Sequence, residues 1–194
     1  RAFASLAGVL LCASTTALAG PISFVGLMVP HLFRLVIGPD MKKILPLSAV
    51  GGAALLLFAD TMGRILGSPG ELESGIVTAL IGAPVFILII RKAKVISNVE
   101  AGYHRRQRKS IVVSLVLLAI ALVLATVMML YGNTIYTPSE VWDALKEVEG
   151  SAVFTVKTLR LPRMLTAILA GFAFGMAGNT FQQLLGNPLA SPDI

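Results

Sequence analysis

The strongest constraint on this chain is a short basic segment that separates two long apolar regions. Between Arg91 and Lys109, seven of the sixteen lysines and arginines occupy nineteen positions. Apolar stretches of about 20 residues, the length that spans a bilayer as a helix, lie on both sides. Short loops rich in lysine and arginine stay on the cytoplasmic side of a membrane. The segment therefore predicts a cytoplasmic loop that sets the orientation of the helices around it.

The composition indicates lipid as the solvent. The chain is 56% hydrophobic and 13% charged, whereas soluble domains average roughly 45–50% apolar and about 25% charged residues. The net charge of +6 is concentrated in loops, so it reports membrane topology rather than a nucleic-acid surface. We predict an all-α fold, a polytopic transmembrane helical bundle. The one cysteine, Cys12, lies in an apolar run and is interpreted as a small buried hydrophobe.

Six apolar stretches predict the helices of the bundle: Ala2–Ala19, Ile22–Ile37, Ile44–Leu66, Glu71–Ile90, Ile111–Tyr131 and Met164–Leu185. The second stretch contains Pro30, so a short or broken helix is expected there. Residues 132–159 are interpreted as a polar external stretch. Within it, Thr137-Pro138-Ser139-Glu140 predicts a capping box that starts a short amphipathic helix, with Trp142 as an interfacial anchor.

The charge bias of the loops predicts the sidedness of the chain. Lys42, the basic loop and Asn187 should face the cytoplasm, while Ser68 and Glu147 should face outward. Because the chain starts at Arg1 and stops just after a loop begins, we interpret it as an internal part of a longer protein.

The predicted helices differ in kind. Residues 111–130 contain no glycine and are aliphatic all round, which is typical of a lipid-facing helix. Two other helices carry small residues at packing spacing, which allows close approach of helix backbones in lipid. These stripes are Gly171, Gly175 and Gly178, and Gly75, Ala79 and Gly82.

Motifs for bond chemistry are absent from the sequence. It has no H-E-x-x-H, no G-x-S-x-G and no cysteine–histidine cluster with metal spacing. His31 stands alone beside a proline and is interpreted as structural. No phosphate-binding G-x-x-x-x-G-K-[ST] loop is present, so any dependence on ATP would come from a partner. We predict no catalytic residue, no cofactor and no metal site.

Charged residues near the ends of the helices are the first functional candidates, because charges at a membrane are costly and often functional. Asp60 and Arg64 are four residues apart on one helix and either pair with each other or serve a function. Arg160 and Arg163 flank Leu161-Pro162 at the external end of a helix. They are either interfacial anchors or contacts for an acidic partner.

Polar residues at the inner end of the last helix are the second group. Asn179, Gln182 and Gln183 lie at membrane depth, where they either bond to neighbouring helices or line a path. The irregular loop 187–192 that follows suits a constriction or a plain helix stop.

Several motifs together resemble the iron-siderophore and vitamin B12 ABC importer permeases, the FecCD family. Leu159-Arg160-Leu161-Pro162-Arg163, the glycine-rich helix after it and the loop Gly186–Pro192 resemble that family's second helix and following loop. Other motifs resemble its C-terminal part: Gly20–Leu27, Val29-Pro30-His31, Arg34, Gly38-Pro39-Asp40, Ala59-Asp60, Arg64 and Gly82-Ala83-Pro84-Val85-Phe86.

In this chain a C-terminal part therefore precedes an N-terminal part. The resemblance implies a fused double permease like those of ferric-hydroxamate importers. Residues 1–94 would end a first module, 95–110 would form a cytoplasmic basic linker, and 111–194 would begin a second module. Two ATP-binding cassette subunits would drive the paired modules from the cytoplasm, and a substrate-binding protein, periplasmic or lipid-anchored, would dock outside.

The resemblance also implies roles for particular residues. Arg64, Arg160 and Arg163 would meet acidic residues of the binding protein, and Asn187 and Leu189 would lie at the cytoplasmic gate. The expected function is import of ferric siderophores through a bacterial inner membrane by alternating access, with lipid and no nucleic acid as the other contacts. Alternatives are a cobalamin or haem importer, an ion-coupled secondary transporter with Asp60 as its ion site, and a membrane anchor.

Overall fold

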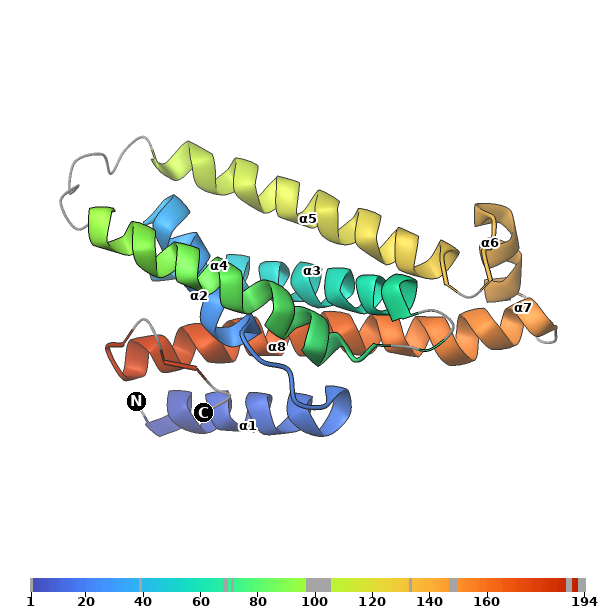
Figure 1. Cartoon of the computed structure of the whole chain (residues 1–194), viewed down its shortest axis with the longest axis horizontal. Helices are drawn as coiled ribbons and strands as arrows, with labels where there is room; N and C mark the ends of the chain where they lie inside the picture. Colours follow the sequence, from blue (N-terminus) through green and yellow to red (C-terminus); the bar gives the residue numbers. More distant parts are fainter. Residues whose placement is uncertain are drawn as a thin grey trace.

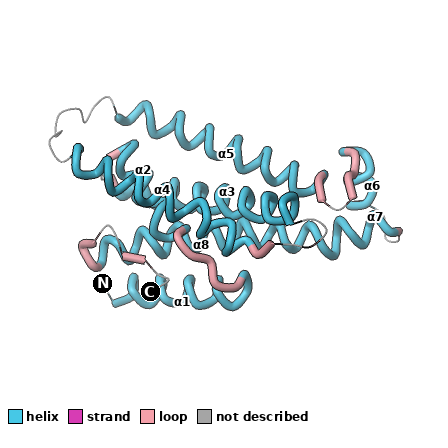
Figure 2. The backbone as a smooth tube through the Cα atoms, viewed as in Figure 1, coloured by secondary structure: helices cyan, strands magenta, loops and turns pink. Residues whose placement is uncertain are grey.

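Helices aligned along one axis form the structure, a computed structural model (Figures 1 and 2). It describes residues 2–38, 40–67, 70, 72–96, 106–132, 134–146, 150–187, 190 and 191, and no strand occurs among them. The elements in chain order are α1 (Ala2–Ala19), α2 (Val25–Ile37), α3 (Met41–Gly67), α4 (Ser74–Ile96), α5 (Arg106–Leu130), α6 (Pro138–Lys146), α7 (Ser151–Val153), the π-helix η1 (Phe154–Arg160) and α8 (Leu161–Leu184). The predicted all-α fold class is confirmed.

Three helices of the described chain are long and apolar enough to cross a bilayer: Met41–Gly67, Ile111–Leu130 and Ser151–Leu184. Shorter apolar helices cover Ser5–Ala19, Val25–Ile37 and Ser74–Leu88. These helices run roughly parallel or antiparallel to one another, as expected for the polytopic bundle that the composition predicts.

Helix α8 occupies the centre of the bundle. It packs most extensively against α3 and also contacts α1 and α2, while α5 lies along α3 on the side away from α1 (Figure 1). The C-terminal ends of α4 and α8 and the N-terminal end of α5 lie at the left end of the view. The C-terminal end of α3, α6 and the start of the α7–η1–α8 helix lie at the right end. The predicted inner and outer ends are thus separated along the bundle.

Some boundaries differ from those predicted. Helices α4 and α5 extend into the basic segment, so that only residues 97–105 separate them, and these lie outside the described residues. Ser68 and Glu147, two of the topology markers, also lie outside them. Helix α3 begins at Met41, before the predicted start, because Asp40 bonds to the free N–H group of Lys42 at its first turn. Helix α2 is short, as predicted, but it continues through Pro30.

The last predicted helix starts earlier than the expected Met164, within the stretch 132–159 that was interpreted as polar and external. Elements α7, η1 and α8 form one continuous helix from Ser151 to Leu184. Pro162 does not break it because the preceding turns are π-helical, with the Leu161 N–H donating to the Val156 oxygen five residues earlier. The wider turn accommodates a proline ring that would clash in a regular α-helix.

The predicted capping box is confirmed at α6. The Thr137 N–H donates to Glu140 Oε2 at 2.7 Å, and the Glu140 N–H donates to Thr137 Oγ1 at 3.4 Å. The two residues satisfy each other's main-chain donors, which fixes the start of the helix.

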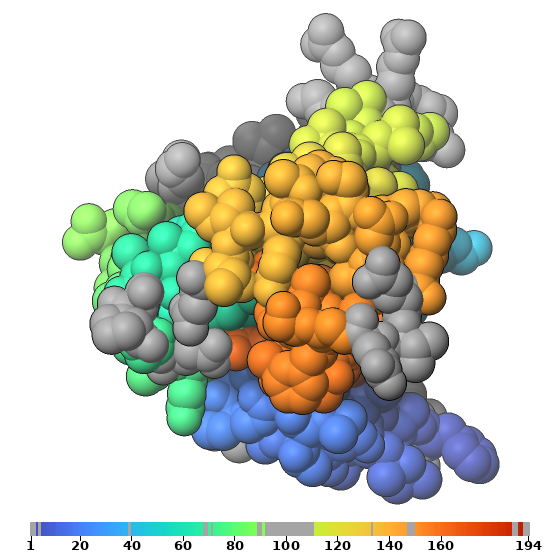
Figure 3. All heavy atoms as spheres, turned by 90° about the vertical axis from the view of Figure 1, so that its right-hand side faces the viewer, coloured from blue at the N-terminus to red at the C-terminus, as the bar shows by residue number. Residues whose placement is uncertain are grey.

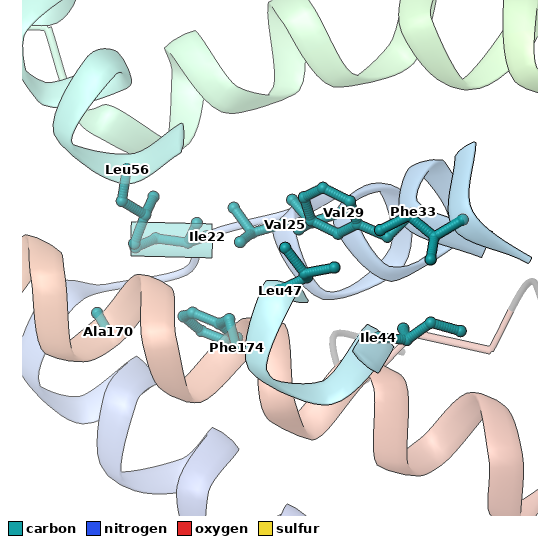
Figure 4. Close-up of a cluster of buried hydrophobic side chains, with 10 residues drawn as sticks. Ile22, Val25, Val29, Phe33, Ile44, Leu47, Leu56, Ala170 and Phe174 are labelled. Carbon is teal, nitrogen blue, oxygen red and sulfur yellow. The ribbon is translucent and has the colours of Figure 1, made fainter. Parts of the chain in front are cut away.

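The core lies between α2, α3 and α8, where aliphatic side chains interdigitate with Phe33 and Phe174 (Figure 4). Glycines of α8 bring the backbones together. A Cβ atom on Gly175 would overlap the Ser48 carbonyl oxygen of α3, and one on Gly178 would overlap the Gly26 carbonyl oxygen of α2. The predicted packing role of this stripe is confirmed.

Candidate functional site

Asp60 is the centre of a charge cluster at the outer end of the bundle. Its Oδ1 accepts from Arg163 Nε of α8 at 2.7 Å and from Ser74 Oγ of α4 at 3.1 Å. Its Oδ2 lies 3.4 Å from Arg64 Nε, one turn later on α3. Asp60 is 4% exposed. One buried carboxylate therefore joins three helices.

Two arginines of this region bind the C-terminal end of α5. Arg64 Nη2 donates to the Met128 oxygen at 3.3 Å, and Arg160 Nη1 donates to the Met129 oxygen at 2.5 Å. Carbonyls in the last turn of a helix have no partner within the helix and carry the negative end of its dipole. A guanidinium group donates hydrogen bonds to these carbonyls, and its positive charge interacts favourably with the negative end of the dipole. These interactions explain why the buried charges are tolerated.

Arg160 is fixed further by the segment after α5. Its Nη2 donates to the Thr134 oxygen at 2.5 Å and to Thr134 Oγ1 at 3.2 Å, and its Cζ lies 4.8 Å from the centroid of the Tyr136 ring. Only 4% of Arg160 is exposed. This arginine is a structural anchor for α5, whatever else it does.

Two cavities flank the cluster. The first, of about 370 Å³, is lined by Arg64, Arg160 and Arg163 together with Thr134, Thr155 and Thr158, and no acidic residue is among its described lining residues. The second, of about 420 Å³, is lined by Asp60, Glu73, Ser74 and Arg163 among mostly apolar residues. Figure 3 views the bundle from this end, with residues of α6 and η1 in front. Arg163 lies on the wall of both cavities.

All three arginines predicted from the sequence therefore meet at one place, but they differ in accessibility. Arg64 is 8% exposed, whereas the Arg163 side chain is 33% exposed. The pairing of Asp60 with Arg64, one of the two alternatives, is present. The bond from Arg163 to Asp60 joins residues 103 positions apart, and the sequence analysis missed it.

A second polar group lies near the inner end, between α8 and α2. Arg34 Nη2 donates to Asn179 Oδ1 at 3.1 Å, and Gln182 Nε2 donates to the Leu27 oxygen at 3.0 Å. Asn179 and Gln182 are both buried. The two amides thus bond to a neighbouring helix, the first of the alternatives considered, and path lining by them stays a prediction.

Gln183 and Asn187, the remaining inner residues that the structure describes, lie at the surface of the chain. Gln183 is exposed and its Nε2 contacts Met41 Sδ at the start of α3. Asn187 is exposed just after α8, and Leu189 lies outside the described residues. Among the described residues, no group of three or more histidine, cysteine, aspartate or glutamate side chains could hold a metal ion.

Comparison with known proteins decides the family. Residues 1–92 and 113–194 match the FecCD transport family. The chain belongs to this family. The family match leaves out residues 93–112, which contain most of the basic segment.

Relatives in the FecCD family are permease proteins. The chain is 49% identical to the ferric enterobactin transport system permease protein FepD of Escherichia coli (strain K12) over 87 residues, which is 45% of this chain and 26% of FepD. It is 52% identical over 83 residues to the vitamin B12 import system permease protein BtuC of Vibrio parahaemolyticus, 43% of this chain and 25% of BtuC. It is 44% identical over 89 residues to the hemin transport system permease protein HmuU of Yersinia pestis, 46% of this chain and 27% of HmuU.

The matched part spans about a quarter of the length of these curated relatives. No solved structure matches the chain. The bacterial permease relatives and the three apolar helices identify a multi-pass protein of the bacterial inner membrane.

Proposed function

We propose that the chain is part of a permease subunit of an ATP-driven importer of ferric siderophores of the iron-hydroxamate type. The observation that supports this most is the family match to two segments on either side of a basic stretch. Bond chemistry would be absent from this subunit. ATP hydrolysis would take place in separate cassette subunits on the cytoplasmic side, and the permease would contribute the path and the gates by alternating access.

We further propose that residues 1–94 and 111–194 come from two fused permease modules, with 95–110 as their cytoplasmic linker. The order of the motifs supports this, because the part that resembles the family's C-terminal region comes first. The extent of the matches is in keeping with two modules, since the match to each of these relatives covers less than half of this chain.

The outer arginine cavity is the proposed docking site for the substrate-binding protein. Three guanidinium groups on one wall favour acidic side chains, which they can bind through paired hydrogen bonds. Arg163 would make the direct contact, because it is the most exposed of the three. Arg64 and Arg160 would shape the cavity and add positive potential while they hold the end of α5.

The inner gate is proposed at Asn187 and Leu189, after the end of α8. An Asn187→Ala, Leu189→Ala double variant should change leak or transport rate more than assembly. A correctly inserted double variant with parental leak and transport would remove both residues from the gate.

The deciding experiment uses the full-length protein reconstituted in proteoliposomes with its cassette subunits and binding protein. Uptake of a ferric hydroxamate should require ATP and be blocked by vanadate. Uptake driven by an ion gradient alone would contradict the proposal and support a secondary transporter.

A vitamin B12 permease and a hemin permease are among the relatives, so cobalamin and haem are the alternative substrates. Competition of unlabelled cobalamin or haem against the ferric hydroxamate would reveal either one.

Docking has its own test. Arg163→Glu should weaken binding of the substrate-binding protein at least tenfold, equal to about 1.4 kcal/mol, without preventing insertion. Lys146→Glu on α6 is the matched control, because it reverses one external charge that is not in the cavity. If the two variants bind the substrate-binding protein with equal affinity at low salt, where screening is weakest, then Arg163 is only an interfacial anchor.

A further inference from the structure

Asp60 and Arg163 occupy linked positions at the outer end. Asp60 is shared by two guanidinium groups, and Arg163 is shared by two cavities. One of these cavities contains the carboxylate that already holds Arg163. The other is the proposed docking site, where a partner's carboxylate would meet the same side chain.

We propose that Asp60 is a positioning residue that competes with the docking partner for Arg163. An aspartate or glutamate of the binding protein, entering the 370 Å³ cavity, would take over the hydrogen bond that Asp60 now accepts from Arg163. Docking would thereby loosen the ion pair between α3 and α8. This inference rests on the docking proposed above and goes beyond it, because it gives the internal carboxylate a role.

The contacts of the three arginines single out Arg163 as the member that exchanges. Arg64 and Arg160 donate to carbonyls of the last turn of α5, which docking would not displace. Arg64 also pairs with Asp60, but it is buried. Arg163 is bonded to a carboxylate, and a second carboxylate offers an equivalent acceptor. Its side chain is one-third exposed, so a partner can reach it.

Release of Arg163 is feasible because Asp60 keeps other partners. A buried carboxylate left without compensation would be strongly destabilising. Asp60 retains the ion pair with Arg64 at 3.4 Å and the hydrogen bond from Ser74 at 3.1 Å. The exchange therefore moves the Arg163 guanidinium from the Asp60 carboxylate to the partner's carboxylate. Both Arg163 and Asp60 keep a charged partner.

The consequence is an energetic coupling between docking and the α3–α8 contact. Coupling between two binding events is reciprocal. If docking weakens the bond from Arg163 to Asp60, then removal of the Asp60 charge must strengthen docking. The direction of this effect is what the experiment measures.

The experiment measures the affinity of the substrate-binding protein for the complete transporter in nanodiscs. Asp60→Asn should tighten docking on the order of fivefold or more, the lower end of typical couplings. Asp60→Glu keeps a carboxylate and should stay near the parent. Glu73→Gln is the matched control, because Glu73 lines the cavity that Asp60 lines but is exposed. Its effect should be about twofold or less, since solvent screens an exposed charge.

A second set of variants shows whether the tighter docking expected for Asp60→Asn depends on Arg163. In an Arg163→Gln transporter, Asp60→Asn should no longer tighten docking. A purely long-range electrostatic effect of Asp60 would persist in that background.

If Asp60→Asn does not fold, because Arg64 stays buried without its carboxylate, a paired change replaces it. The Asp60→Asn, Arg64→Gln transporter should dock more tightly than the Arg64→Gln transporter, in which Asp60 still holds Arg163.

The outcomes separate the two proposals. Parental docking in Arg163→Gln would overturn the docking site itself. Weakened docking in Arg163→Gln, together with no more tightening in Asp60→Asn than in Glu73→Gln, would overturn the competition and leave the docking site standing.

Discussion

Helices α5 and α8 are both long and apolar, yet their surroundings are opposite. Over 18 residues of α5 the mean hydropathy is 3.0 and 6% of that stretch is buried within the bundle, whereas over 18 residues of the helix that ends in α8 the mean hydropathy is 1.4 and 50% of the stretch is buried. The more hydrophobic helix is the more exposed one. In lipid, apolar side chains gain little by leaving the solvent, so close backbone packing and polar bonds decide which helix is central.

The two helices are also held differently. Glycines along α8 place its backbone against α2 and α3 over several turns. Helix α5 also lies along α3, but it has a further attachment at its C-terminal end, where Arg64 and Arg160 bind its last carbonyls. Packing along a length and bonding at an end should respond differently to substitution.

The largest effect is expected for Gly178→Leu in α8. The added side chain would overlap the Gly26 carbonyl oxygen of α2. Backbone cannot move aside as a side chain can, so the loss of stability should reach at least about 3 kcal/mol, the upper end of the usual range for overpacking. Thermal unfolding in detergent would measure it. Val116→Leu on the exposed face of α5 is the control, and equal losses in the two variants would remove the contrast between the helices.

A smaller effect is expected for Arg160→Gln, which tests the anchoring of α5. The shorter side chain would leave the Met129 and Thr134 oxygens without their donor. Hydrogen bonds to a charged group contribute about 1.5–3 kcal/mol, and these two are part-buried. Proteolysis between α5 and α6 should increase with the loss of stability. Lys146→Gln, an exposed charge on α6, should change neither quantity.

Asn179→Leu should cost less again, about 1.5 kcal/mol, the lower end for a hydrogen bond to a charged group. The variant loses the bond from Arg34 but also removes Asn179 Nδ2, which has no hydrogen-bond partner among the described residues. Gln183→Leu, at an exposed position of α8, is the control for thermal unfolding. A loss as large as that of Gly178→Leu would mean that polar bonds, not glycines, dominate this interface.

The smallest effect is expected at α6, outside the α5–α8 contrast. The N–H of Thr137, followed by its hydroxyl, lowers the pKa of the Glu140 carboxyl below its ordinary value. Protonation in the folded state is therefore disfavoured, so the contribution to stability is present above the ordinary pKa and is lost as pH falls through the lowered one. Amide exchange of α6 should be slower at about pH 6 than at about pH 3, after correction for intrinsic rates. Glu140→Gln should flatten that difference.

The sequence was sufficient where a local signal marks a boundary. Helix α1 ends at Ala19, just before Gly20-Pro21, and α6 begins at its capping box, both as predicted. It was insufficient at η1, because Thr155, Lys157 and Thr158 resemble a polar loop and Pro162 resembles a helix start. A π-helical turn has no sequence signature that would have corrected this.

The candidate site followed the same division. Arg160 and Arg163 were identified individually, because arginines at the predicted external face oppose the usual charge bias, and Arg64 was identified as a costly charge at a membrane and by the family resemblance. Their grouping around one cavity, and the sharing of Asp60 between two of them, depend on how α3 meets α8. That geometry is set by contacts of the glycine stripe of α8; the sequence predicts the stripe but not which residues of the neighbouring helices it meets.

The length of the helix from Ser151 to Leu184 has a mechanical consequence. Its 34 residues correspond to about 50 Å at the rise of an α-helix, whereas the hydrocarbon layer is about 30 Å thick. One rod thus carries Arg160 and Arg163 in its N-terminal half, and Asn187 lies just beyond its C-terminal end. A tilt of this rod about its glycine contacts, which lie in its C-terminal half at Gly171, Gly175 and Gly178, would act as a lever that moves the end near Arg163 and the end near Asn187 in opposite directions.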